Sequence, residues 1–190
     1  MKELKEKLAF KNYYIQKMTV DDVGDDYLNW INDPEINEFL ESKYTVWTMD
    51  SLKEYVRSFE NTNVKFLFTI NDMVTNKYIG NGSISSVNYN TEVFYFALFI
   101  GDKNYWGKHA AFETSMLLLK FGFEELNMRK VFGGAYSNQL ASRFVLKRVG
   151  MEQEAKLKAS FKYKNKFVDQ VIYSLHKDEW DKTKVKHELK

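Results

Sequence analysis

The feature that most constrains the fold is an unbroken apolar run at residues 93–100, VFYFALFI, which leads through a glycine-bearing turn into a helical pattern. Eight apolar residues are far fewer than the roughly 20 that a helix needs to span a bilayer, so the run predicts a strand buried on both faces. A second β-branched and aromatic run follows at residues 130–136. The two runs and the helix between them predict a strand-helix-strand unit.

The turn at residues 101–111 is where the sequence first indicates chemistry. The first N–H groups of a helix have no partner within that helix, and the positive end of the helix dipole lies beside them. Such a terminus binds phosphate groups. An ordinary connection between a strand and a helix has the same pattern, so both interpretations stay open on this segment alone.

The remaining periodicities predict a mixed α/β fold in which an antiparallel meander precedes the strand-helix-strand unit. Strands are expected at residues 13–18, 65–70, 78–84, 93–100, 130–136, 152–163 and 167–175. Helices are expected from a cap at Thr19 to residue 31, after a cap at Thr48, and at residues 108–126 and 139–148.

Length and punctuation predict a single domain at residues 1–190. Pro34 is the only proline, and no Gly/Ser-rich stretch marks a linker. We expect the core to occupy about residues 11–180 and the tail, residues 181–190, to be a frayed end.

Composition excludes several classes of function. The 28 basic and 26 acidic residues give a charge of +2, which indicates neither nucleic acid nor a membrane as a partner. Cysteine is absent, and the three histidines have no ligand spacing, so no metal site is predicted. The N-terminus lacks the apolar stretch of a signal peptide, so we expect a cytoplasmic protein. Both a monomer and a homodimer stay open.

Several short motifs, in one shared order, resemble the GNAT superfamily of N-acetyltransferases over residues 14–180. The resemblance is to the branch that contains the ribosomal-protein alanine N-acetyltransferases. The matching segments are WINDPEI at residues 30–36, IGDKNYWGK at 100–108, Glu113, FEELNMRK at 123–130, Asn138, Gly150 with Met151, and Asp169.

This resemblance implies the GNAT fold, a mostly antiparallel central sheet flanked by helices, and acetyl-coenzyme A as cosubstrate. Backbone N–H groups of the central strand would polarise the thioester, and Asn138 would contact the pantetheine arm. The strand residues are Leu98, Phe99 and Ile100. The pyrophosphate would lie on the turn that contains Trp106, Gly107, Lys108, His109, Ala110 and Ala111.

Three departures from the family pattern limit what the resemblance implies. His109 replaces the first motif glycine, where it either donates a hydrogen bond to a phosphate or caps the surface. Leu146 stands where many relatives carry a tyrosine that protonates the leaving thiolate. The acidic residue that relatives often have near Tyr95 is missing, so the sequence shows no clear general base.

Without a clear base, we expect an acceptor amine of low pKa, deprotonated through water, Glu92 or Tyr95. The favoured acceptor is a nucleotide-linked amino sugar. A protein N-terminus is the alternative, and a non-catalytic acyl-coenzyme A binding protein stays open as another class. Candidate acceptor contacts, expected between the N-terminal helices and the last hairpin, are Trp30, Asn32, Glu41, Tyr44 and Phe161.

Overall fold

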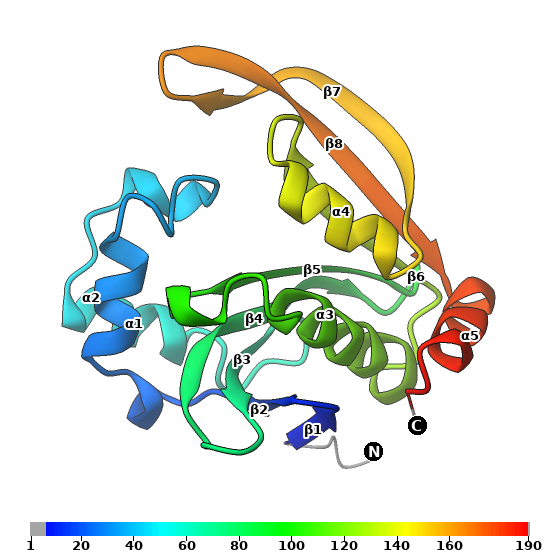
Figure 1. Ribbon diagram of the computed structural model, residues 1–190, viewed down its shortest axis with the longest axis horizontal. Helices are drawn as coiled ribbons and strands as arrows, with labels where there is room; N and C mark the ends of the chain where they lie inside the picture. Colours follow the sequence, from blue (N-terminus) through cyan, green and yellow to red (C-terminus); the bar gives the residue numbers. More distant parts are fainter. Residues whose placement is uncertain (1–6, 190) are drawn as a thin grey trace.

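The computed structural model describes residues 7–189, so residues 1–6 and 190, at the ends of the expected domain, lie outside the described residues. Eight strands form one sheet in the order β1-β2-β3-β4-β5-β6-β8-β7 (Figure 1). The strands are β1 (Lys7–Phe10), β2 (Tyr13–Lys17), β3 (Phe66–Asp72), β4 (Tyr78–Asn88), β5 (Val93–Ile100), β6 (Lys130–Tyr136), β7 (Glu152–Tyr163) and β8 (Lys166–His176). Only β5 and β6 pair in parallel, which confirms the predicted mixed, mostly antiparallel sheet.

Helices cover both faces of the sheet. The α-helices are α1 (Asp25–Asn32), α2 (Met49–Arg57), α3 (Ala110–Lys120), α4 (Leu140–Arg148) and α5 (Lys177–Lys186), and the short helices are η1 (Val20–Asp22), η2 (Glu41–Tyr44), η3 (Lys103–Tyr105) and η4 (Phe121–Glu125). The buried side chains of α3, α4 and α5 join the larger apolar cluster, and those of α1 and α2 join a smaller one. No helix within residues 7–189 is long and apolar enough to cross a membrane.

The parallel pairing of β5 and β6 follows from the helix between them, because parallel neighbours need a crossover connection. Helix α3 supplies that crossover, and its side chains from Met116 to Leu119 are completely buried. Helix α3 continues into a π-helical turn, η4, in which the ring of Phe94 lies where a side chain at Gly122 would be. The predicted helix at residues 108–126 is therefore present, but its last turn is wider than an α-helix.

The helix expected from Thr19 to residue 31 is two helices. Asp22 accepts a hydrogen bond from the backbone N–H of Thr19 over 2.7 Å and another from its hydroxyl over 3.0 Å. This capping box starts the short helix η1, which ends at Asp22, and α1 begins separately after Gly24.

Two predictions about the chain ends were wrong. The core begins before residue 11, because β1 pairs with β2 and buries Leu8 and Phe10. The expected frayed tail is largely helical: α5 buries Trp180 completely, where it stacks on Phe123, and Leu189 is also buried. The sequence did not predict α5 because its few apolar residues are separated by charged ones and form no clear helical pattern.

A buried carboxylate ties the first hairpin to α3. Glu113 is only 3% exposed and accepts hydrogen bonds from the backbone N–H and the side-chain amide of Asn12, both over 2.9 Å. Asn12 follows Lys11, whose φ of 51° makes the tight β1–β2 turn. The carboxylate therefore holds a turn whose N–H group would otherwise be left without an acceptor.

Replacing this carboxylate tests how much it stabilises the fold. Glu113→Leu is expected to lower the free energy of unfolding by about 1–3 kcal/mol, because it removes the carboxylate that accepts both hydrogen bonds from Asn12. Glu113→Gln, which keeps one acceptor oxygen, is expected to lose less. Urea unfolding of the three proteins measures the difference, and a Leu variant as stable as the wild type would contradict the assignment.

Candidate active site

Strands β5 and β6 pair at only three positions and then part. The pairs are Val93 with Lys130, Phe94 with Val131, and Tyr95 with Phe132. Beyond them β6 stays paired with β8 as far as Tyr136. Within residues 7–189, the edge of β5 after Tyr95 therefore has no strand beside it. Its backbone N–H and C=O groups are available to a ligand that presents amides in an extended conformation.

The prediction that β5 is buried on both faces was wrong. Phe94 and Phe96 are buried on the α3 side, but Tyr95 is 43% exposed and Ala97 is also exposed. The run is apolar on both faces, as a fully buried strand would be. One of these faces lines an open groove instead of the core.

The turn after β5 is fixed by three side chains. The carboxylate of Asp102 accepts the N–H of Asn104 over 2.9 Å, the indole N–H of Trp106 donates to the carbonyl of Ile100 over 2.8 Å, and the hydroxyl of Tyr13 donates to the carbonyl of Lys108 over 3.0 Å. Gly107 has a φ of +77°. These hydrogen bonds fix the conformation of the turn, at whose end the first N–H groups of α3 lie without partners in the helix.

His109 occupies the left-handed conformation that the family pattern gives to glycine, with a φ of 63°. Its Nδ1 lies 3.1 Å from a guanidinium nitrogen of Arg148 on α4. A guanidinium only donates, so Nδ1 accepts and the imidazole proton belongs on Nε2. The side chain is turned toward α4, so it need not crowd a group that approaches the turn.

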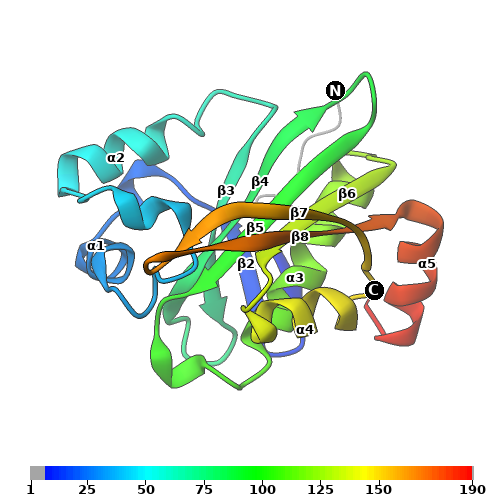
Figure 2. The same cartoon turned by 90° about the horizontal axis from the view of Figure 1, so that it is seen from above.

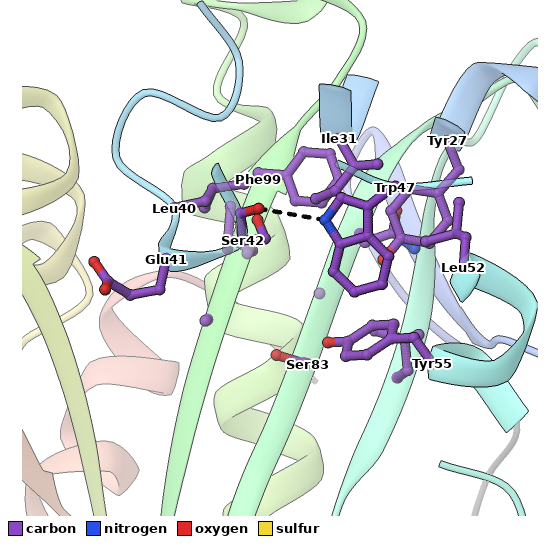
Figure 3. A pocket seen from close by; sticks show the side chains of 15 residues that line it. Tyr27, Ile31, Leu40, Glu41, Ser42, Trp47, Leu52, Tyr55, Ser83 and Phe99 are labelled. Atoms are coloured by element: carbon purple, nitrogen blue, oxygen red, sulfur yellow. Dashed lines mark hydrogen bonds between the residues drawn. The ribbon is translucent and has the colours of Figure 1, made fainter. Parts of the chain in front are cut away.

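A pocket of about 240 Å³ opens on the face of β5 that is turned away from α3, beneath α1, η2 and α2 (Figure 3). Four aromatic rings, those of Tyr27, Trp47, Tyr55 and Phe99, stand in its walls. The carbonyl of Ser42 accepts the indole N–H of Trp47 over 3.3 Å. Glu41 is the one charged residue among those that line it. The lining residues are Tyr27, Ile31, Leu40, Glu41, Ser42, Trp47, Leu52, Tyr55, Leu67, Asn81, Gly82, Ser83, Ala97, Leu98 and Phe99.

Two of the five predicted acceptor contacts serve the structure around this pocket. Asn32 bonds both backbone groups of Trp47, accepting its N–H over 3.0 Å and donating to its carbonyl over 3.0 Å. Trp30 packs on Tyr78 and occupies the space beside Gly101, outside the pocket. Asn32 therefore holds a wall of the pocket, and Trp30 is a packing residue.

The other three predicted contacts meet around Tyr136, which the sequence analysis missed. The Tyr136 hydroxyl donates to Glu41 over 2.5 Å, and the ring stacks on Phe161 at 4.1 Å between centroids. Tyr44 donates to the carbonyl of Lys162, beside Phe161. Burial, and then the hydrogen bond to Glu41, raise the pKa of the Tyr136 phenol. These residues join η2 to the tip of the β7–β8 hairpin (Figure 2). They come from segments about 95 or more residues apart, which no short-range pattern connects.

The structure separates the two predicted catalytic residues. Tyr95 is in the last pair before the strands part and stacks on Phe132 at 5.1 Å. Glu92 is in the turn before β5, exposed, and its carbonyl accepts the N–H of Arg129 over 2.8 Å. Glu92 thus lies beside the paired end of the two strands, away from the pocket.

The other positions singled out in the sequence lie on the β6 side of the gap that opens where β5 and β6 part. Asn138 is exposed just after β6. Leu146 is buried, and its side chain lies against Gly133 of β6. Within the described part of the chain, no group of three His, Asp or Glu side chains is arranged to hold a metal ion.

The role of Asn32 can be tested by hydrogen exchange. Asn32→Ala removes the acceptor of the Trp47 N–H, so exchange at that amide is expected to accelerate by about fivefold, the value of one ordinary hydrogen bond. Asn32→Asp keeps the acceptor and is expected to show a smaller change. An unchanged exchange rate in the Ala variant would mean that Asn32 does not hold this wall.

Comparison with known proteins gives a family for this geometry. Residues 13–152 match the model of the acetyltransferase (GNAT) domain. The uncharacterized N-acetyltransferase YnaD of Bacillus subtilis (strain 168) is 27% identical over 100 residues, which are 53% of this chain and 59% of that protein. The match thus spans little more than half the length of either protein.

Solved structures share the fold. The spermidine N-acetyltransferase from Vibrio cholerae, in complex with CoA and spermine, has a TM-score of 0.80 and 17% identity, covering 90% of this chain and 99% of that one. RimJ of Mycobacterium smegmatis, in complex with CoA-disulfide, has a TM-score of 0.78 and 13% identity, covering 93% and 89%. The family model spans most of the sheet and both sides of the gap, so this chain belongs to the GNAT acetyltransferase family.

Proposed function

We propose that this protein transfers an acetyl group from acetyl-coenzyme A to a primary amine. One observation carries the proposal: the residues of β5 that lie beyond the last β6 pair, Ala97 to Phe99, also line the aromatic pocket. The open edge of β5 accepts the cosubstrate from one side, and the pocket brings an acceptor to the same residues from the other. Membership of the GNAT acetyltransferase family supports this arrangement.

In this proposal the pantetheine amides pair with the free edge of β5, and the pyrophosphate lies on the turn from Trp106 to Ala111. The N–H groups at the start of α3 suit such an anion. The proton on Nε2 of His109 and the ammonium of Lys108 add donors beside them. Asn138, exposed at the end of β6, is the proposed pantetheine contact.

The chemistry is direct transfer. The unprotonated amine attacks the thioester carbon, a C–N bond forms, the C–S bond breaks, and the amine proton leaves to water. A backbone N–H near Leu98 stabilises the oxyanion that develops. Leu146 has no proton to give, so the thiolate takes its proton from water or leaves as the anion. Tyr95 remains a candidate for proton transfer because it lies at the mouth of the gap.

The favoured acceptor remains an amino sugar. The faces of Trp47, Tyr55 and Phe99 offer stacking surfaces for the apolar side of a sugar ring, and the hydroxyls of Ser42 and Ser83 offer hydrogen bonds. A protein N-terminus, expected if the chain acts like the ribosomal-protein alanine acetyltransferases, is the alternative. Both acceptors have amines that are less basic than a lysine side chain.

The coenzyme site can be tested at Gly107. A Cβ there would meet no other atom within 4 Å, so the only obstacle to Gly107→Val is the φ of +77°. Forcing a branched residue into that conformation costs about 1–2 kcal/mol. A turn that leaves this conformation to relieve the strain no longer presents its N–H groups, so coenzyme A affinity is expected to fall by about tenfold, as measured by calorimetry, while the unfolding temperature falls by at most a few degrees.

Gly24→Val is the matched control for this experiment. Gly24 also has open surroundings, but its φ of −133° suits any residue. The control is expected to bind coenzyme A like the wild type. Equal affinity of the Gly107 and Gly24 variants would count decisively against the proposed pyrophosphate site.

An acceptor panel tests the activity. Free thiol release is measured with amino sugars, their nucleotide-linked forms, peptides with free α-amines, and lysine side chains. The rate is expected to rise with pH in step with the unprotonated fraction of each amine, because no dedicated base controls it. At neutral pH a lysine amine, with a pKa near about 10.4, is expected to react far more slowly than an α-amine with a pKa of about 7.7–8.0.

Three outcomes would contradict parts of this proposal. Lysine side chains that react as fast as amino sugars at neutral pH would exclude a requirement for a weakly basic amine. A large loss of rate in Glu92→Gln, with coenzyme binding retained, would identify a dedicated base. Thermal stabilisation by acetyl-coenzyme A without turnover of any amine would favour a non-catalytic binding protein.

A further inference from the structure

A chain of two hydrogen bonds ends on the only carboxylate of the pocket. The Lys43 ammonium donates to the Tyr136 hydroxyl over 2.8 Å, and that hydroxyl donates to Oε1 of Glu41 over 2.5 Å. Lys43 also donates to the carbonyls of Glu38 and Lys162, over 2.9 and 3.2 Å. With three acceptors around its ammonium, Lys43 is fixed, and it leaves the phenol proton pointing at Glu41.

The same bonds leave one oxygen of Glu41 available. Within residues 7–189, Oε1 receives the Tyr136 proton and Oε2 has no hydrogen-bond partner. Glu41 is exposed, whereas Tyr136 is only 2% exposed. In Figure 3 the Glu41 side chain extends from η2 away from the aromatic side chains, so its carboxylate lies at the rim of the pocket, where Tyr136 of β6 meets it. A buried donor, itself bonded to Lys43, therefore holds an accessible carboxylate with a free oxygen.

We propose that Oε2 of Glu41 accepts an N–H of the acceptor's amino group, and that Tyr136, backed by Lys43, is the positioning residue that fixes this carboxylate. The inference rests on the proposed function, since it assigns the amine-recognition part of that site. Every other residue that lines the pocket is uncharged, so Glu41 is the group that attracts the ammonium form of the acceptor, a charge that a neutral alcohol of the same shape lacks. An N–H held by a fixed oxygen also restricts the direction of the nitrogen lone pair.

A purely structural role for Tyr136 is the competing explanation, because the same region docks the hairpin onto the N-terminal segment. Tyr163 provides a second bond of the same chemistry at this junction, since its hydroxyl donates to Oε1 of Glu38 over 2.9 Å and its ring stacks on Phe39. Glu38 and Tyr163 do not line the pocket. Tyr163→Phe therefore removes a comparable docking bond and leaves Glu41 untouched.

The experiment compares Tyr136→Phe, Tyr163→Phe, Glu41→Gln and the double variant Tyr136→Phe/Glu41→Gln in the full chain. Steady-state kinetics use whichever of a nucleotide-linked amino sugar, an alanine-starting peptide and spermidine the wild type acetylates fastest. Coenzyme A affinity and unfolding temperature are measured for each protein. Tyr136→Phe is expected to raise the acceptor KM by about five- to tenfold, with kcat changed less than about threefold and coenzyme A affinity unchanged.

The double variant decides whether Tyr136 acts through Glu41. If it does, Glu41→Gln raises KM at least as much as Tyr136→Phe, and the double variant is no worse than Glu41→Gln alone. Tyr163→Phe is expected to keep the wild-type KM within about twofold. Multiplying effects in the double variant, or equal KM values for Tyr136→Phe and Tyr163→Phe, would overturn the proposal and leave hairpin docking as the role of Tyr136.

These results stay separate from the test of the acceptor class. A peptide or a polyamine as the fastest acceptor would overturn the amino sugar, while the four variants would still report on Glu41 with that amine. A wild type that acetylates none of the three amines overturns both the proposed function and this inference.

Discussion

The short parallel pairing of β5 and β6 is the constraint on which the rest of the structure depends. Helix α3 brings β6 back beside β5, but only three residue pairs form before the strands diverge. Strand β6 then follows β8 instead. A longer pairing would satisfy the backbone of β5 within the protein and close the gap. The unpaired edge is therefore what makes a central strand available to an extended ligand.

The turn that follows β5 is held by contacts of its own. The indole of Trp106 bonds the last carbonyl of β5, and Tyr13 of β2 bonds the carbonyl of Lys108, so the start of α3 is held at the mouth of the gap. His109 keeps the left-handed backbone of a glycine without its freedom, and its ring is tied to Arg148. Although His109 replaces the glycine of the family pattern, it thus keeps the left-handed backbone conformation that the glycine allows.

The acceptor side is assembled from parts that are remote in the chain. The pocket wall from η2 is joined to β6 and to the β7–β8 hairpin by Lys43, Tyr136 and the aromatic stack on Phe161. Asn32 holds Trp47 from the end of α1. A movement of the β7–β8 hairpin would therefore be transmitted to the pocket through these few contacts. The proposed coenzyme site, by contrast, is formed by the sheet and α3.

The sequence by itself determined the strands from β2 onward, the crossover helix, the glycine-bearing turn and the resemblance to the family, because each follows from local spacing and short motifs. It mistook β5 for a strand buried on both faces, since a groove-lining face and a core face have the same apolar composition. It missed α5 and the role of Tyr136, whose hydrogen-bond partners Lys43 and Glu41 lie 93 and 95 residues away in the chain. Only the tertiary structure decided where β5 and β6 part and which partner holds the Glu41 carboxylate at the rim of the pocket, because both depend on contacts between segments that no local pattern couples.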